Sequence, residues 1–173
     1  MSLDAEWDTI KTNHGMVIAQ DKIAIIQLSF KLSEEGKVHA LILQVHKRKS
    51  LPERLLALLA DPEITFTGRA IGGDFKKIAR DFNCETQTRR AKTTDLGMMA
   101  RVRDVVTSAV VGLDHLVELT LGQRLSKAPA VRLSKWSANQ LSDEQIVYAA
   151  LDVIKALEVH FYLNQLPDLT ARL

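Results

Sequence analysis

The sequence predicts an α/β domain, with three antiparallel strands first and helices after them. Two β-branched apolar runs, residues 22–30 and 38–45, are typical of buried strands. Helical periodicity dominates residues 142–163, near the other end of the chain. Between these regions a short strand at residues 64–68 separates two helical segments, which completes the α/β pattern.

Composition describes one globular domain that comprises the whole chain, residues 1–173. Apolar residues make up 46% and charged residues 25% of the chain, a balance that excludes disordered and fibrous classes. The single cysteine, Cys84, excludes an internal disulfide. There is neither an apolar run of membrane-spanning length nor a secretory signal pattern. We therefore expect an intracellular protein, nuclear or cytoplasmic, with no membrane partner.

Charge alone does not predict a nucleic-acid binder, because the chain has 23 basic and 21 acidic residues and is therefore close to neutral. The basic residues nevertheless fall into four clusters along the chain. Each cluster taken singly is typical of solvated surface, whereas clusters around one shared site could neutralise a phosphate backbone. The clusters are Lys47, Arg48 and Lys49; Lys76 and Lys77; Arg89, Arg90 and Lys92; and Arg124, Lys127, Arg132 and Lys135.

The first strand is expected over residues 3–7, LDAEW. Its period of two sends Asp4 and Glu6 to the same face. Adjacent carboxylates repel, and a cation between them relieves the repulsion, although a solvated strand edge is the simpler interpretation. A central strand normally has more residues ahead of such a pair, so the domain could be excised from a longer protein.

The next two strands are the runs KIAIIQLSF at residues 22–30 and VHALILQV at 38–45, joined by a turn at 34–37. Residues 8–21 link the first strand to the second and contain Gly15, so another antiparallel strand alongside is the simplest arrangement. The chain thus opens with a three-strand meander.

Two helices surround the strand at residues 64–68. Ser50 and Glu53 have the spacing of a capping box for a helix over residues 51–60. After the strand, two glycines and Asp74 open a helix over residues 75–82. Asp74 is most simply a helix cap, but it also follows the carboxyl end of a strand, where ligands gather in open α/β sheets.

The middle of the chain carries weaker signals. A short strand is expected among residues 89–93, and Asp95 is interpreted as the cap of a helix over 96–102. Residues 112–122 form an amphipathic helix closed by Gly122, with His115 at its surface. An irregular crossing at 125–139 carries Arg132, Lys135 and Trp136; Trp136 is either core or a surface on which a base stacks.

The last helix begins with a capping box formed by Ser142 and Gln145. Tyr148 and Asp152 stand four residues apart and project from the same face. One interpretation is a core tyrosine beside a satisfied polar residue. The other is that Asp152 binds a metal ion and Tyr148 positions a water molecule.

Taken together, these motifs resemble the DEDD exonuclease family in its tyrosine subclass. Asp4, Glu6, Asp74, Tyr148 and Asp152 occur in the order and spacing of that family. The last segments are similar to the exonuclease domain of the Werner syndrome protein and its relatives. The histidine subclass is disfavoured, because Val147 stands five residues before Asp152. The similar segments are residues 3–7, 68–82, 111–127 and 131–152.

The resemblance implies a ribonuclease H-like fold, in which a five-stranded mixed sheet is flanked by helices. It implies a 3′–5′ exonuclease that hydrolyses DNA or RNA with two Mg²⁺ or Mn²⁺ ions. Asp4 would bridge the ions, Glu6 and Asp152 would complete the water-activating one, and Asp74 would hold the second. Tyr148 would orient the attacking water.

Two other functions stay open at this point: a catalytically silent nucleic-acid-binding module, and a small interaction domain unrelated to nucleic acid. The complete set of acidic residues argues against the first, because binding alone needs cations more than carboxylates. Candidate nucleic-acid contacts are Arg132, Lys135 and Trp136. The sequence decides neither DNA against RNA nor the oligomeric state.

Overall fold

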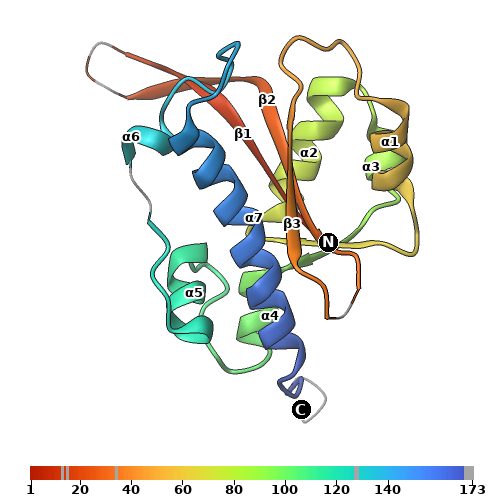
Figure 1. Cartoon of the computed structure of the whole chain (residues 1–173), viewed down its shortest axis with the longest axis vertical. Helices are drawn as coiled ribbons and strands as arrows, with labels where there is room; N and C mark the ends of the chain where they lie inside the picture. The colour runs from red at the N-terminus through yellow and green to blue at the C-terminus, as the bar shows by residue number, and fades with distance from the viewer. Residues whose placement is uncertain (13, 15, 34, 127–128, 170–173) are drawn as a thin grey trace.

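A computed structural model describes residues 1–12, 14, 16–33, 35–126 and 129–169, and its five strands form one sheet in the order β3-β2-β1-β4-β5 (Figure 1). The first three strands are antiparallel, and the last two are parallel to β1, so the predicted mixed sheet is confirmed. The strands are β1 (Ser2–Lys11), β2 (Val17–Lys31), β3 (Val38–Gln44), β4 (Thr65–Gly68) and β5 (Lys92–Asp95).

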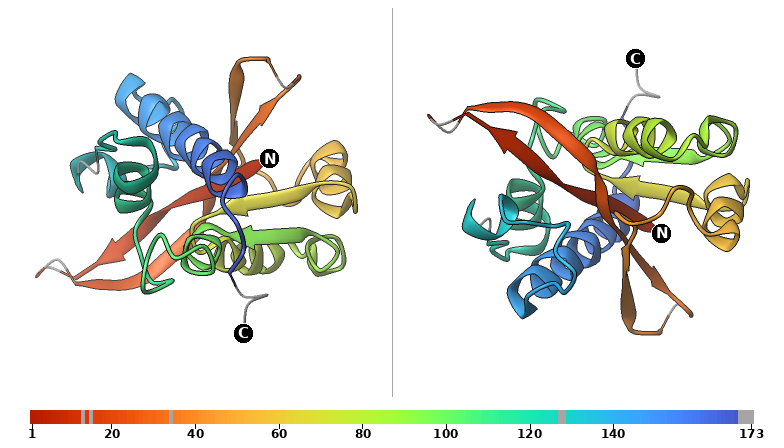
Figure 2. Two further views of the ribbon diagram at one scale, coloured as in Figure 1. Left: turned by 90° about the horizontal axis from the view of Figure 1, so that it is seen from below. Right: turned by 90° about the horizontal axis from the view of Figure 1, so that it is seen from above.

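Helices cover both faces of this sheet, and the two views of Figure 2 place α7 on the opposite face from α2. One buried cluster joins β1 and β2 to α1 and α2, whereas α7 packs against β2 and against α4 and α5. The helices are α1 (Glu53–Ala60), α2 (Ile71–Phe82), α3 (Glu85–Thr88), α4 (Leu96–Arg101), α5 (Leu113–Leu121), α6 (Pro129–Arg132) and α7 (Asp143–Asn164). In the described part of the chain, no helix has the length and apolar character needed to cross a membrane.

The first two strands are longer than the sequence predicts. Residues 8–11 lengthen β1 and residues 17–21 lengthen β2, and together they form an arm that projects from the sheet (Figure 2). Irregularities interrupt the pairing on both sides of Trp7 and again between Ile10 and Lys11. Three residues named above lie outside the described residues: Gly15 of the link between the first two strands, Glu34 of the predicted turn and Lys127 of a basic cluster.

The capping box predicted at Ser50 is wrong. The helix α1 begins at Glu53, and its N-cap residue is Pro52, which makes no side-chain cap. Proline disfavours helical backbone at the residue before it, so Leu51 cannot belong to the first turn. The other end of the predicted segment is confirmed, because the helix ends at Ala60.

Candidate active site

The two acidic residues of β1 lie on the face of the sheet that packs against α7. In the register of β1 with β2, Asp4 is paired with Gln27 and Glu6 with Ile25, and side chains directly opposite each other share a face. Ile25 belongs to a buried cluster with Ala149 of α7. The period of two therefore places both carboxylates beneath the helix.

The helix α7 presents Tyr148 and Asp152 to β1. Its start is fixed by the predicted capping box, which is confirmed: Gln145 N donates to Ser142 Oγ at 3.2 Å, and Ser142 N donates to Gln145 Oε1 at 2.9 Å. Ala149 and Val153 are buried beside the two polar residues. A fixed start and a buried apolar stripe set the rotation of the helix, and so the direction of Asp152.

Three carboxylates meet between these elements. Asp4, Glu6 and Asp152 each offer an oxygen atom, and these atoms lie within 4.8 Å of one another. One oxygen of Asp4 also accepts a hydrogen bond from Ala5 N at 2.9 Å. Mg²⁺ and Mn²⁺ prefer oxygen ligands, so the chemistry of this donor set fits a hard divalent cation.

Asp74 faces the same cleft from α2 and is 8% exposed. The interpretation of Asp74 as a helix cap is wrong, because α2 begins at Ile71 with Ala70 as its N-cap residue, and Asp74 is the fourth residue of the helix, within its first turn. The turn before α2 is held by Asp95, whose Oδ2 accepts a hydrogen bond from Ala70 N at 2.6 Å. Ala70 has a left-handed backbone, with φ 56° and ψ 26°. Asp95 also caps α4 through Met98 N at 3.0 Å, as predicted.

Burial and mutual repulsion raise the pKa values of these carboxyl groups. The pKa of Asp4 rises to about 7, because burial and then the charge of Asp152 disfavour its ionised form. Burial and then the neighbouring aspartates raise the pKa of Glu6 to about 9, although Arg132 opposes the rise. Burial and the charge of Asp4 raise the pKa of Asp74 to about 8. The group therefore holds protons at neutral pH unless cations replace them.

Tyr148 stands above the carboxylates as a protonated phenol. Burial, and then the charges of the nearby acidic groups, raise its pKa far above the ordinary value. Its ring centroid lies 6.0 Å from that of Trp136, at an interplanar angle of 46°. The phenol can donate a hydrogen bond into the cleft, but it does not act as a base near neutral pH.

The cleft over these groups has a volume of about 580 Å³. Part of its wall consists of residues 110–113, of Arg132 at the end of α6 and of Leu133 directly after it. Arg69 ties this wall to the turn before α2, because it donates to the carbonyl of Val111 and pairs with Asp95 at 3.2 Å. Arg132 is exposed, as is Lys135 three residues later. One predicted nucleic-acid contact thus lines the cleft, and a second lies close to it in sequence.

The third predicted contact, Trp136, is not available to nucleic acid. Its side chain is 0% exposed and packs with Ile25 and Ala149. Its indole N–H donates to the carbonyl of Arg132 at 3.1 Å. A base cannot stack on a covered ring, so the prediction of base stacking is wrong, and the alternative of a core tryptophan describes the structure.

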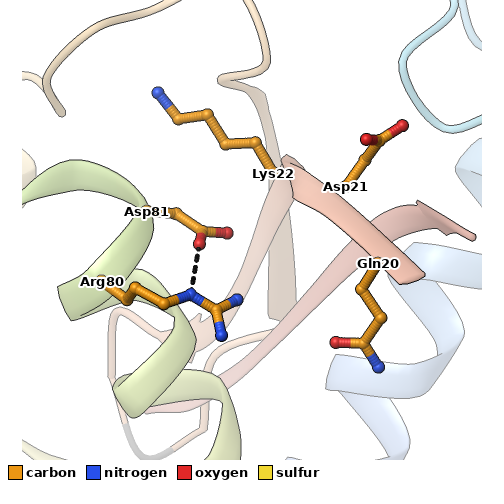
Figure 3. Close-up of a pocket in the computed structure, with 5 residues that line it drawn as sticks. All are labelled: Gln20, Asp21, Lys22, Arg80 and Asp81. Carbon is orange, nitrogen blue, oxygen red and sulfur yellow. Dashed lines mark hydrogen bonds and ion pairs between the residues drawn. The ribbon is translucent and has the colours of Figure 1, made fainter. Parts of the chain in front are cut away.

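A second hollow, of about 510 Å³, lies where β2 passes the end of α2 (Figure 3). Its acidic groups do not converge, since Asp81 is engaged by Arg80 Nε at 3.0 Å and by Lys77 Nζ at 3.1 Å. Burial opposes ionisation of Asp81, but hydrogen bonds from Ile23 N and from these two cations keep its pKa below the ordinary value. Both ion pairs lie within α2, and the hydrogen bonds from Ile23 N to Asp81 and from Lys77 Nζ to the carbonyl of Asp21 join this helix to β2. The residues that line this hollow do not form a carboxylate cluster like the one beneath α7.

Asp8, which also belongs to β1, is not among the residues predicted from the sequence. Asp8 Oδ1 accepts hydrogen bonds from Trp136 N at 2.5 Å and from Ser137 N at 3.2 Å, and Oδ2 accepts one from Ser137 Oγ at 2.5 Å. The alternation of Asp4, Glu6 and Asp8 along one strand was the available signal. The strand predicted from the sequence ends at Trp7 and so does not include Asp8.

Comparison with protein families gives one match that spans almost the whole chain. The family model described as 3′-5′ exonuclease matches residues 1–166.

Two curated fruit-fly proteins, each named 3′-5′ exonuclease, are also similar. The Drosophila melanogaster protein is 31% identical over 155 residues, which are 88% of this chain and 40% of the relative. The Drosophila willistoni protein is 34% identical over 167 residues, which are 95% of this chain and 44% of the relative. The chain thus spans about two fifths of the length of these relatives.

Solved structures of nucleases share the fold. Brucella melitensis NrnC has a TM-score of 0.72 at 20% identity, and the match covers 99% of this chain and 76% of that one. Escherichia coli RNase D, described as an exoribonuclease involved in structured RNA processing, has a TM-score of 0.68 at 23% identity. That match covers 94% of this chain and 38% of RNase D. At these identities the likeness establishes the ribonuclease H-like architecture.

Proposed function

Because the chain belongs to the 3′–5′ exonuclease family, we propose that it hydrolyses phosphodiester bonds from the 3′ end of DNA or RNA. We place it in the tyrosine subclass of the DEDD exonucleases. The observation that carries this proposal is the meeting of Asp4, Glu6 and Asp152 within 4.8 Å, in a cleft that Asp74 and Tyr148 also line.

The carboxylates are proposed to hold two Mg²⁺ or Mn²⁺ ions. When bound, such ions activate a water molecule and neutralise charge on the leaving oxygen. Asp4, Glu6 and Asp152 would hold the first ion, and Asp74 with Asp4 the second. The raised pKa values of Asp4, Glu6 and Asp74 support this assignment, because crowded carboxylates gain most from a shared cation. One solved relative in fold, Brucella melitensis NrnC, is described with bound Mg²⁺.

The remaining cleft residues act on the substrate without metal. Tyr148, held as a protonated phenol, donates a hydrogen bond that orients the attacking water or the scissile phosphate. Arg132 also lines the cleft and is positively charged, so it can bind a phosphate of the nucleic-acid chain that enters the cleft. NrnC bound to pGG and Trypanosoma brucei RNase D with RNA U12 show that other proteins with this fold take nucleotide chains, which supports the same substrate class here.

The direction of digestion tests this function. Single-stranded and recessed-duplex oligonucleotides of DNA and RNA, labelled at the 5′ end, are incubated with the protein and Mg²⁺ or Mn²⁺. We expect a ladder that shortens from the 3′ end and that disappears with EDTA or with a 3′-terminal phosphorothioate block. Binding without shortening would instead identify a silent nucleic-acid-binding module.

Tyr148→Phe should lower kcat by about 10²-fold, because the positioned hydrogen-bond donor is lost. The ring and its packing against Trp136 stay in place, so the Mn²⁺-induced shift in Tm should match that of wild type. Single-turnover hydrolysis and thermal unfolding measure the two effects. If the variant lost its response to Mn²⁺, the tyrosine would have a structural role in the cation site.

A further inference from the structure

We propose that Asp8 is a positioning residue for the nuclease reaction, which through Trp136 holds Arg132 and Tyr148 at the cleft. This inference rests on the proposed function. The side chain of Asp8 does not line the cleft; it binds Trp136, which contacts Arg132 and Tyr148, two residues that do.

The contacts of Asp8 join two distant parts of the chain. Its carboxylate accepts hydrogen bonds from the backbone N–H groups of Trp136 and Ser137 and from the hydroxyl of Ser137, at 2.5 to 3.2 Å. A half-buried carboxylate with three donors is a strong connection, because hydrogen bonds to a charged acceptor are worth more than neutral ones. Asp8 lies two residues after Glu6 on β1, so it fixes the segment 132–137 relative to the strand that carries the acidic pair.

Trp136 contacts both Arg132 and Tyr148, so its position affects both residues. Its indole N–H donates to the carbonyl of Arg132 at 3.1 Å, which fixes the end of α6. Its ring packs against that of Tyr148 with centroids 6.0 Å apart. A fully buried indole has little room to shift. A displacement of its backbone therefore moves both the guanidinium and the phenol.

A second set of bonds holds the same segment to α7 alone. Gln145 Nε2 donates to Ser134 Oγ at 2.8 Å and to the carbonyl of Lys135 at 3.1 Å. Without Asp8 the segment would still follow α7, but its distance from β1 would not be fixed by these bonds. Asp8 thus fixes the position of Arg132 relative to Glu6. The charge of Arg132 already lowers the pKa of Glu6 in this arrangement.

A double-mutant cycle of Asp8→Asn with Arg132→Gln tests the proposal. Asparagine keeps one acceptor oxygen but removes the charge and the second acceptor. We expect kcat/KM to fall about tenfold for Asp8→Asn in the wild-type background, and about threefold or less in the Arg132→Gln background, where only the part that acts through Tyr148 remains, because residues that act through one contact are not additive. Ser137→Ala, which removes a single hydrogen bond, should show the same coupling with a smaller effect if Asp8→Asn folds poorly.

Asp81→Asn is the matched control, because Asp81 is also a carboxylate with three donors, namely Ile23 N of β2 and the side chains of Lys77 and Arg80 on its own helix. It should lower Tm, and its effect on kcat/KM should be the same in both Arg132 backgrounds. If Asp8→Asn behaved in this additive way in an active protein, Asp8 would only stabilise the fold, and the inference would be overturned while the proposed function stood. An inactive wild type would overturn both.

Discussion

The Asp4→Asn variant should lose nuclease activity by about 10³-fold or more in kcat/KM and at the same time become more stable without cations. Asp4 belongs to the carboxylate cluster, so its loss removes a ligand of the proposed ions. The same substitution removes one charge from a group of carboxyls whose pKa values are raised by burial and then by mutual repulsion. In EDTA at pH 8 we expect Tm to rise by about 3 °C or more. Cleavage assays and thermal unfolding measure the two effects.

Glu63→Gln is the matched control, because Glu63 is an exposed carboxylate outside the cleft. It should leave both activity and Tm within error of wild type. An Asp4→Asn protein that kept its activity would contradict the proposed cation site. One that lost activity together with stability would point to Asp4 as a structural residue.

The cation-free protein should lose stability as the pH rises, and Mn²⁺ should restore it. The carboxyl groups of Asp4, Glu6 and Asp74 have folded-state pKa values of about 7, 9 and 8, against ordinary values of 3.8, 4.5 and 3.8. Between the ordinary and the raised values the folded state binds more protons than the unfolded state. The free energy of unfolding therefore falls as pH increases through that window.

Thermal unfolding in EDTA should show Tm falling by about 5 °C or more between pH 6 and pH 8.5. Added Mn²⁺ should raise Tm strongly at pH 8.5 and only weakly at pH 5.5, where protons compete for the same oxygens. Asp4→Asn, which removes one of the groups, should flatten both dependences. A Tm that rose with pH in EDTA would mean that neither burial nor repulsion raises the pKa values of these carboxyl groups in the folded state.

The elements of the site could be predicted wherever local pattern decides the structure. The period of two places Asp4 and Glu6 on one face of β1, and the capping box at Ser142 fixes the start of α7 and the face of Asp152. Gly122 closes α5 with a φ of 63°, as the glycine after a helix predicts. These features depend on neighbours within a few residues, which the sequence displays directly.

The features that could not be predicted from the sequence depend on contacts between residues that are distant along the chain. The residues around Asp74 predict a helix cap, but Asp95, which is remote in sequence, holds Ala70, and the helix starts at Ile71, four residues earlier than predicted. Trp136 was expected to serve either as core or as a stacking surface, and only packing with Ile25 and Ala149 decides between them. Asp8 was overlooked because its partners, Trp136 and Ser137, lie at the other end of the chain.

The central claim is that carboxylates from β1 and α7 share a hard cation with Asp74 nearby. Crystals soaked in MnCl₂ and measured at the manganese absorption edge test it most directly. The account predicts anomalous density between Asp4, Glu6 and Asp152, with a second peak on the side of Asp74. A cleft that holds no manganese at a concentration that supports hydrolysis would contradict it.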